Sequence, residues 1–289
     1  MAQQVTTLTL KQYKEKKKKI VSLTAYDYST AQVLDRNGVD VILVGDSLAM
    51  VVLGHKSTHP VTVDQMIHHT QAVVRGVERA MVVADMPFMS YQEDVKEAVK
   101  NAGRFIKEAR AQAVKLEGAS RLILETIERL VDIGIPVMGH LGFTPQSVHA
   151  LGGFRVQGKT AEKAMKLMND AQALERVGVF GMVLEMVPAS VSKVITENLE
   201  VPTIGIGAGP YCDGQILVID DMLGKFTDFK PSFVRQYANL AEVSSKAIAD
   251  YASDVRSNNY PNNEESFHLS SEEEAALLGL VDSKVFQRK

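Results

Sequence analysis

Eight short apolar runs, separated by longer stretches of helical periodicity, are the feature that most constrains how this 289-residue chain folds. The runs occupy residues 20–25, 39–45, 81–85, 113–117, 135–140, 180–185, 201–207 and 215–220. They are rich in Val and Ile, and they are apolar at successive positions rather than at every second one. This pattern is typical of strands that are buried on both faces, as in a parallel sheet.

The stretches between the runs predict helices. Apolar side chains recur with a period of about 3.6 residues in 63–79, 93–112 and 160–177, and Thr160 is suited to cap the third stretch. Repeated strand–helix units predict an α/β fold, and eight of them favour a (β/α)8 TIM barrel over a doubly wound open sheet. We expect a single domain over 1–289, with a short N-terminal lead-in and a C-terminal helical tail.

Composition excludes several classes of protein. With 32 basic and 35 acidic residues, the chain has no excess positive charge that would draw it to nucleic acid or to an anionic membrane. Its single cysteine, Cys212, excludes an intrachain disulfide and a cysteine-based zinc cluster. No apolar run approaches the roughly 18 residues of a membrane span, and the first residues lack an apolar signal core. We therefore expect a cytoplasmic protein with no nucleic-acid or membrane partner.

Ionisable residues stand at the ends of several apolar runs, where a parallel barrel places its active site. Taken singly, an Asp after a strand is more often a helix cap or a turn residue than a ligand. Several such residues near one barrel axis need compensating charge, and this favours a functional site. The set comprises Asp46, Asp85, Lys115, Glu117 and Glu185, and His140 ends the fifth run.

The residue types in this set favour a hard cation. Asp46 and Asp85 follow neighbouring strands, so their carboxylates are placed to share one ion. Because no set of His and Cys accompanies them, Mg²⁺ is preferred to Zn²⁺. Lys115 and Glu117 lie two apart on one strand and therefore face the same side. Glu185, on the far arc of the barrel, remains available as a proton acceptor.

The chain resembles the ketopantoate hydroxymethyltransferase (3-methyl-2-oxobutanoate hydroxymethyltransferase) family over about residues 5–268. The resemblance is carried by the motifs VGDS, ADMPF, VKLEG, HLGFTPQS, LEMVP, IGIGAG and DGQ, which occur in family order. It implies a (β/α)8 barrel in a homo-oligomer, usually a decamer. It also implies transfer of a hydroxymethyl group from 5,10-methylenetetrahydrofolate to 3-methyl-2-oxobutanoate, forming 2-dehydropantoate in pantothenate biosynthesis.

The same resemblance implies roles for individual residues. Asp46 and Asp85 match Mg²⁺ ligands that also contact the substrate, with one ion in each subunit. Ser47 and Lys115 match residues that bind the 2-oxo acid substrate. Glu117 matches a third carboxylate at the metal, acting through the ion's water shell.

Glu185 in the LEMVP motif matches the family's proton acceptor. The residue set suits an enolate mechanism, because a metal-bound keto oxygen accepts the charge that develops when the C3 proton leaves. Lys115 adds positive charge beside that oxygen. We expect the loops around 54–60 and 205–214 to form walls of the folate pocket.

Three positions depart from the family pattern. Ala119 stands where the motif usually continues as VKLEGG, and Asp220 stands where many members have histidine. Glu265 replaces the histidine of the C-terminal EHSF motif. None of the three is a residue to which the resemblance assigns chemistry.

Two other functions are compatible with the residue pattern. The first is a Mg²⁺-dependent 2-oxo acid lyase or mutase of the phosphoenolpyruvate mutase and isocitrate lyase type. Such enzymes typically carry a catalytic cysteine in a lid loop, whereas Cys212 lies in the turn GPYCDG. The second is a barrel that binds a ligand without catalysis, which the joint presence of the five charged strand-end residues disfavours.

Overall fold

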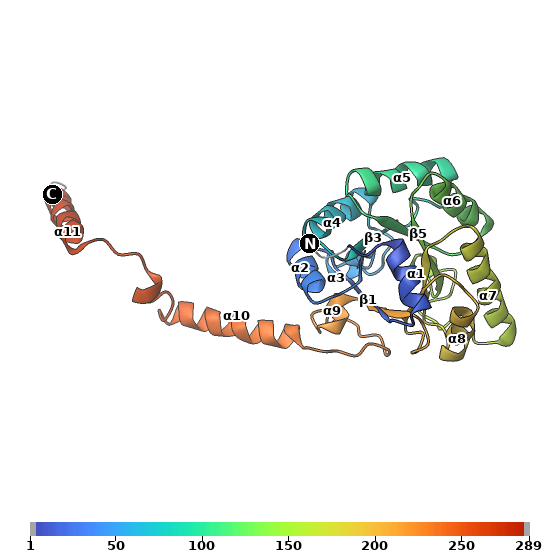
Figure 1. Ribbon diagram of the computed structural model, residues 1–289. Helices are drawn as coiled ribbons and strands as arrows, with labels where there is room; N and C mark the ends of the chain where they lie inside the picture. Colours follow the sequence, from blue (N-terminus) through green and yellow to red (C-terminus); the bar gives the residue numbers. More distant parts are fainter. Residues whose placement is uncertain (1–3, 286–289) are drawn as a thin grey trace. The chain divides into compact units, whose positions relative to one another are not determined.

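The computed structural model describes residues 4–285, which form two compact units (Figure 1). The first unit ends at Ala238 and contains the whole barrel, and the second begins at Asn239. Each unit is described here by itself.

Eight parallel strands close into a barrel, in which each strand pairs with the next along the chain and β8 pairs with β1. The strands are β1 Ile20–Thr24, β2 Val41–Val44, β3 Met81–Asp85, β4 Ala113–Glu117, β5 Val137–Gly142, β6 Gly181–Glu185, β7 Thr203–Ile206 and β8 Gly214–Leu217. Each apolar run of the sequence overlaps one strand. The predicted (β/α)8 barrel is therefore confirmed.

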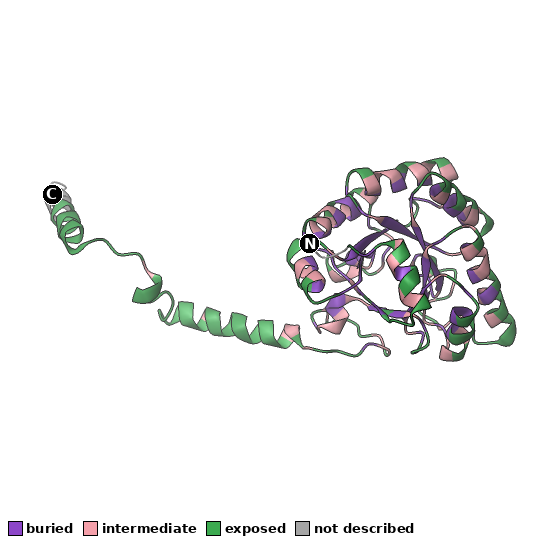
Figure 2. Cartoon of the chain, in the orientation of Figure 1, coloured by how far each residue is buried: buried purple, intermediate pink, exposed green. Residues whose placement is uncertain are grey.

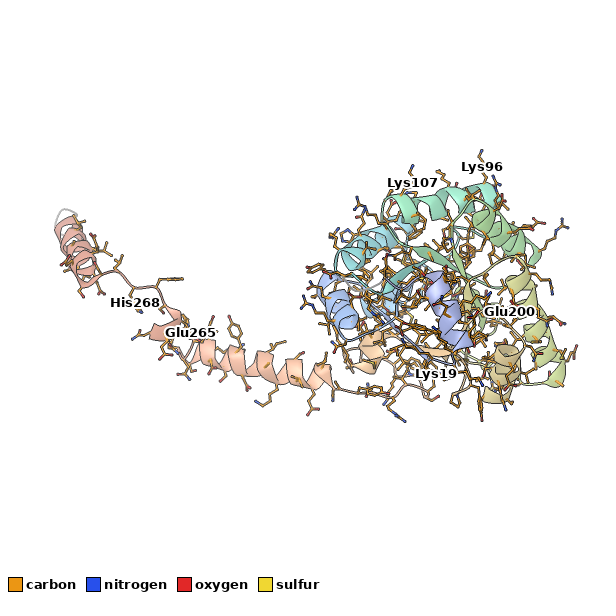
Figure 3. The ribbon with its side chains drawn as sticks, in the orientation of Figure 1. Lys19, Lys96, Lys107, Glu200, Glu265 and His268 are labelled. Atoms are coloured by element: carbon orange, nitrogen blue, oxygen red, sulfur yellow. The ribbon has the colours of Figure 1, made fainter. Side chains whose placement is uncertain are left out.

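Helices surround the barrel in Figure 1. They are α1 Thr7–Glu15, α2 Tyr28–Arg36, α3 Leu48–Val51, α4 Val63–Arg75, α5 Val95–Lys107, α6 Arg121–Asp132, α7 Ala161–Arg176, α8 Ala189–Glu197 and α9 Ile219–Met222, with the 3₁₀ turn η1 Pro145–Ser147. The predicted cap of α7 is confirmed, because the Thr160 side chain accepts a hydrogen bond from the Lys163 backbone N–H. The polar faces of the helices point to solvent, as Lys96 and Lys107 of α5 do in Figure 3.

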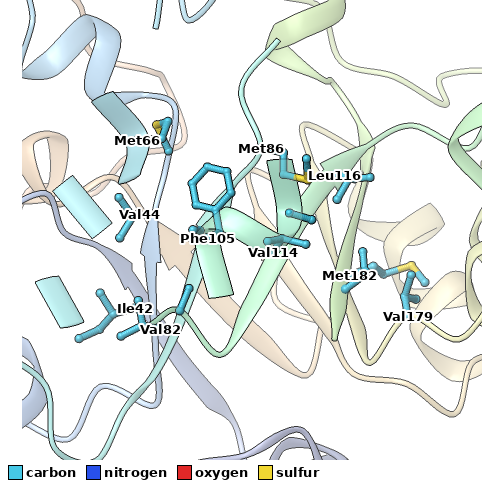
Figure 4. Close-up of a cluster of buried hydrophobic side chains, with 14 of the residues drawn as sticks. Ile42, Val44, Met66, Val82, Met86, Phe105, Val114, Leu116, Val179 and Met182 are labelled. Atoms are coloured by element: carbon cyan, nitrogen blue, oxygen red, sulfur yellow. The ribbon is translucent and has the colours of Figure 1, made fainter. Parts of the chain in front are cut away.

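Alternate residues of each strand face two different apolar layers. In β2, Ile42 and Val44 point outward and pack against the helices, in the layer shown in Figure 4. Val41 and Leu43 belong to the cluster inside the barrel, which Leu10 of α1 also joins. Figure 2 shows the strands buried and the helices exposed on their outer sides. Burial on both faces explains why the runs are apolar at successive positions.

The eighth strand ends earlier than its apolar run predicts. The chain leaves the sheet after Leu217, and the Ile219 backbone N–H donates to the Thr24 hydroxyl of β1 at 3.0 Å instead of continuing the ladder. Asp220 therefore lies in α9 rather than at a strand end.

The second unit contains α10 Leu240–Arg256, the turn η2 Asn263–Glu265 and α11 Ser271–Val285. No residue of α10 is buried. Glu265, labelled in Figure 3, accepts from the Asn262 backbone N–H at 3.1 Å and completes a capping box at η2. The glutamate that stands at position 265, where the family motif has histidine, thus stabilises the local turn. In the described part of the chain, no helix is long and apolar enough to cross a membrane.

Candidate active site

The strand register brings the predicted residues together at the carboxyl ends of the strands. Asp85 of β3 lies beside Lys115 of β4, and Glu117 lies beside His140 of β5. These ends surround a cavity of about 550 Å³. Its lining includes all six residues predicted for the site, Asp46, Ser47, Asp85, Lys115, Glu117 and Glu185, together with His140.

A buried ion pair forms the floor of the cavity. Lys115 Nζ lies 2.5 Å from Asp85 Oδ1, and the two side chains are only 5% and 4% exposed. The other Asp85 oxygen, Oδ2, accepts a hydrogen bond from the Asp46 backbone N–H at 3.0 Å. This bond orients the turn that follows β2. A side chain at Gly45 would come within 2.7 Å of Ser47 Oγ and would displace the Ser47 hydroxyl.

Ser47 is positioned by a buried tyrosine. Its hydroxyl lies 2.8 Å from the Tyr26 hydroxyl, which comes from the segment after β1. Burial raises the pKa of Tyr26 above its ordinary value, so the phenol stays protonated. One of the two hydroxyl groups donates to the other, and Ser47 keeps its place at the cavity wall.

His140 connects the two arcs of the site. Its Nδ1 lies 3.2 Å from Glu117 Oε1, and its Nε2 lies 3.3 Å from Glu185 Oε2. Burial, followed by the charge of Lys115, lowers the pKa of His140, so the imidazole is neutral at physiological pH. The sequence placed His140 at a strand end but assigned it no role. Its contacts identify it as a part of the site that the sequence analysis missed.

Gln146 in η1 is a second residue that the sequence analysis missed. Its Nε2 donates to Asp46 Oδ2 and to the Met86 carbonyl, each at 2.9 Å, and its Oε1 accepts from the Tyr91 hydroxyl at 2.7 Å. Its backbone N–H donates to Glu117 Oε2 at 3.0 Å. The only sequence signal was its place in the motif TPQS, since a neutral amide has no titration signature.

The floor of the site carries more negative than positive charge. Burial, opposed by Lys115, raises the pKa of Glu117 to about 7, and burial together with Asp85 and Glu117 raises the pKa of Asp46 well above its usual range. Burial alone would lower the pKa of Lys115, but the surrounding carboxylates outweigh it and the pKa lies above the ordinary value. Burial also raises the pKa of Glu185. A second cation would therefore be stabilised here.

The carboxylates do not form a preformed cluster of metal ligands. Within residues 4–285, no group of three or more His, Cys, Asp or Glu side chains is arranged to hold a metal ion. Asp85 Oδ1, although it contacts Lys115, has no hydrogen-bond partner of good geometry among the described residues. The oxygens that remain available for a cation thus come chiefly from the neighbouring pair Asp46 and Asp85.

Comparison with known proteins decides the family. The sequence model of ketopantoate hydroxymethyltransferase matches residues 4–263. The 3-methyl-2-oxobutanoate hydroxymethyltransferase of Thermoanaerobacter sp. (strain X514) is 55% identical over 273 residues, which cover 94% of this chain and 99% of that protein. That of Chlorobaculum parvum is 53% identical over 267 residues, covering 91% and 96%. The chain belongs to the ketopantoate hydroxymethyltransferase family. It is accordingly a transferase, as the sequence predicts.

Solved structures share the fold of this family member at low sequence identity. A phosphonopyruvate hydrolase in complex with oxalate and Mg²⁺ has a TM-score of 0.59 at 11% identity, with 98% of each chain covered. A 2,3-dimethylmalate lyase of the phosphoenolpyruvate mutase and isocitrate lyase superfamily has a TM-score of 0.55 at 12% identity, covering 98% of this chain and 97% of that chain. At these identities the likeness supports the barrel architecture alone.

The two family departures within the barrel unit lie outside the cavity lining. Asp220 is buried and pairs with Lys225 across 3.2 Å, and Ala119 packs against the helical layer of the core. The loop around 54–60 lines the cavity through Lys56, Ser57 and Thr58, and its role as a wall of the folate pocket stays a prediction. Of the expected wall at 205–214, only Ile206 lines the cavity. The other side of the cavity is formed instead by residues after β8.

Proposed function

We propose that this enzyme transfers a hydroxymethyl group from 5,10-methylenetetrahydrofolate to 3-methyl-2-oxobutanoate, forming 2-dehydropantoate in pantothenate biosynthesis. The observation that carries the proposal is the buried Lys115–Asp85 pair, which stands beside Asp46 in one cavity with Glu185 on the opposite arc. A buried lysine ammonium in the same cavity as a carboxylate base suits the formation of an enolate from a 2-oxo acid. The family name supports the reaction class.

We propose Mg²⁺ as the cofactor, with one ion in each subunit. The donors fit this ion, because Asp46 and Asp85 supply hard carboxylate oxygens at a site with excess negative charge. Mg²⁺ is usually held by one or two carboxylates and several waters, which agrees with the lack of a three-residue cage. Glu117 would act through the water shell. When bound, the ion would withdraw electron density from the keto oxygen of the substrate.

Lys115 and Ser47 would bind the 2-oxo acid. The Lys115 ammonium is held at the floor by Asp85 and stays charged, so it stabilises the oxygen that becomes negative as the enolate forms. The Ser47 hydroxyl, held by Tyr26, offers a hydrogen bond to the substrate carboxylate. These contacts would fix the C3 atom of the substrate relative to the base.

Glu185 would remove the C3 proton. A carboxylate of ordinary pKa is a weak base for a carbon acid, and each unit by which burial raises the pKa improves proton transfer by about 1.4 kcal/mol. The raised pKa of Glu185 therefore suits this role. His140, whose Nε2 lies 3.3 Å from Glu185 Oε2, would orient the carboxylate. Water would first release the one-carbon unit of the folate as formaldehyde, with both N–CH2 bonds broken and tetrahydrofolate as the leaving product. The carbon nucleophile then adds to the formaldehyde carbon, and protonation of the oxygen gives the hydroxyl group.

The alternative is a lyase or mutase of the phosphoenolpyruvate mutase and isocitrate lyase type, whose members share the fold. Those enzymes typically use a lid cysteine. Cys212 is fully buried and absent from the cavity lining, and burial raises the pKa of its thiol. This position disfavours the alternative.

We further propose that the chain works as one catalytic domain with a helical tail and assembles into a homo-oligomer. A decamer in the cytoplasm is the state that the family resemblance implies. The near balance of charge agrees with small-molecule substrates and no nucleic-acid or membrane partner. Analytical ultracentrifugation of the full chain would reveal its assembly.

Deuterium exchange at C3 of 3-methyl-2-oxobutanoate, followed by NMR, tests the reaction in two stages. We expect exchange with Mg²⁺, none with EDTA, and 2-dehydropantoate after methylenetetrahydrofolate is added. Exchange without transfer would retain the enolate site and reject the folate donor. No exchange by folded protein with bound metal would reject the proposed function.

A further inference from the structure

The cavity is lined by both buried charged residues and exposed aromatic residues. Four of its charged residues, Lys115 among them, are buried, whereas the cavity is also lined by Phe154, Phe226 and Phe229. Phe154 is 58% exposed and Phe229 is 53% exposed. Exposed large apolar side chains that gather at a cavity commonly mark a ligand-binding surface. The exposed rings thus offer an aromatic surface outside the part of the cavity that the 2-oxo acid would use.

The two exposed rings come from different loops and lie beside one another at a tilt. Phe154 lies between β5 and α7, and Phe229 follows α9. Their ring centroids are 6.1 Å apart with a tilt of 44°. The fully buried Phe143 supports Phe154 from behind, with its ring centroid 5.0 Å away. One aromatic platform is therefore anchored in the core while part of its surface stays open to a planar ligand.

A carboxylate without a partner belongs to the wall of the same cavity. Asp221 lines the cavity, and its side chain makes no hydrogen bond or ion pair within residues 4–285. The neighbouring Asp220, by contrast, pairs with Lys225. An unpartnered and partly buried carboxylate is an acceptor of two parallel hydrogen bonds. A ring that presents two adjacent N–H donors, as a 2-amino-4-oxopyrimidine does, would satisfy it.

We propose that Phe154, Phe229 and Asp221 bind the pterin ring of the folate donor. The ring stacks on the phenylalanines, and its N3–H and 2-amino N–H donate to the two oxygens of the Asp221 carboxylate. This assignment rests on the proposed function for the identity of the donor. A pterin held on these rings places the one-carbon unit between the aromatic surface and the floor, where Lys115 and Glu185 would hold the 2-oxo acid.

Binding of tetrahydrofolate to the full-length, Mg²⁺-loaded enzyme by isothermal titration calorimetry tests the assignment. Because stacking on aromatic side chains contributes strongly to binding of planar rings, Phe154→Ala and Phe229→Ala should each weaken the affinity by about tenfold or more. Asp221→Asn replaces one acceptor with a donor, and we expect a similar loss. Phe154→Tyr should keep the affinity. Phe267→Ala and Asp228→Asn, which change exposed residues outside the cavity lining, are matched controls.

Steady-state kinetics adds a second readout. The KM for methylenetetrahydrofolate should rise in the alanine variants far more than the KM for 3-methyl-2-oxobutanoate. Unchanged tetrahydrofolate affinity in all three variants would overturn the assignment while leaving the proposed function intact. If the variants lose affinity and light scattering also shows a changed mass of the assembly, the two rings would be contacts between subunits. That result would also overturn the assignment. A wild-type enzyme that exchanges C3 protons but does not bind tetrahydrofolate would overturn both the assignment and the folate donor.

Discussion

Gln146 donates a hydrogen bond from its side-chain Nε2 to Asp46 Oδ2 across 2.9 Å, although the two residues lie 100 positions apart in the chain. Through its backbone N–H, Gln146 also holds Glu117. One neutral residue in η1 thus orients two of the three carboxylates assigned to the metal site, Asp46 through its side chain and Glu117 through its backbone. Residues that orient metal ligands in this way typically affect metal affinity by about 10–100-fold.

The first prediction concerns this hydrogen bond. Gln146→Leu should weaken Mn²⁺ binding by about tenfold or more, because Asp46 loses its orienting donor. Mn²⁺ titration followed by electron paramagnetic resonance measures the affinity. Gln157→Leu, which removes an exposed glutamine bonded only to the Arg155 carbonyl, is the control. Wild-type affinity in a folded Gln146→Leu enzyme would contradict the orienting role.

The second prediction concerns the buried pair of Lys115 and Asp85. Removing one partner of such a pair leaves an uncompensated buried charge, so Lys115→Met should lower the free energy of unfolding of the metal-free protein by about 3–5 kcal/mol. Equilibrium unfolding in urea measures the change. Lys166→Met breaks an exposed pair with Asp170 and should cost about 1 kcal/mol or less. Equal losses in the two variants would show that burial does not govern this pair.

The sequence predicted the eight strands and the positions of five charged site residues, because both follow from local pattern, whereas Ser47 was assigned through the family resemblance. Strands buried on both faces leave continuous apolar runs, and parallel topology places all strand ends on one face. The predicted end of β8 was wrong. The strand ends early because the Ile219 backbone N–H donates to Thr24 in β1, which lies almost 200 residues earlier in the chain.

The roles of His140 and Gln146 could not be predicted from local pattern. Each contacts residues that are distant in the sequence: His140 lies between Glu117 and Glu185, and Gln146 donates to Asp46 in the turn after β2. No spacing rule encodes such contacts, because they depend on how loops close over the barrel. Asp221 directly follows the last apolar run, and the absence of a hydrogen-bond or ion-pair partner for it within residues 4–285 is visible only in the fold.

The third prediction concerns Glu185 as the base. Glu185→Gln should abolish exchange of the C3 proton while 3-methyl-2-oxobutanoate still binds. In the wild-type enzyme, exchange requires ionised Glu185, so the rate should rise with pH through a midpoint above the ordinary carboxyl value, because burial raises this pKa. NMR exchange rates measured against pH provide the check. Normal exchange in Glu185→Gln would remove Glu185 from this role.

The fourth prediction concerns the pH dependence of metal binding. Burial raises the pKa of Glu117 to about 7 and that of Asp46 well above its usual range, so the metal-free site holds protons near neutrality. A cation must displace these protons, and Mn²⁺ affinity should therefore increase as pH rises from 6 to about 8 and then level off. Glu117→Gln removes one of these groups, so the affinity of this variant should depend less steeply on pH. Calorimetry in buffers of different ionisation enthalpy counts the protons released on binding. Binding with no proton release at pH 6 would contradict the raised pKa values and, with them, the crowding of carboxylates around Lys115.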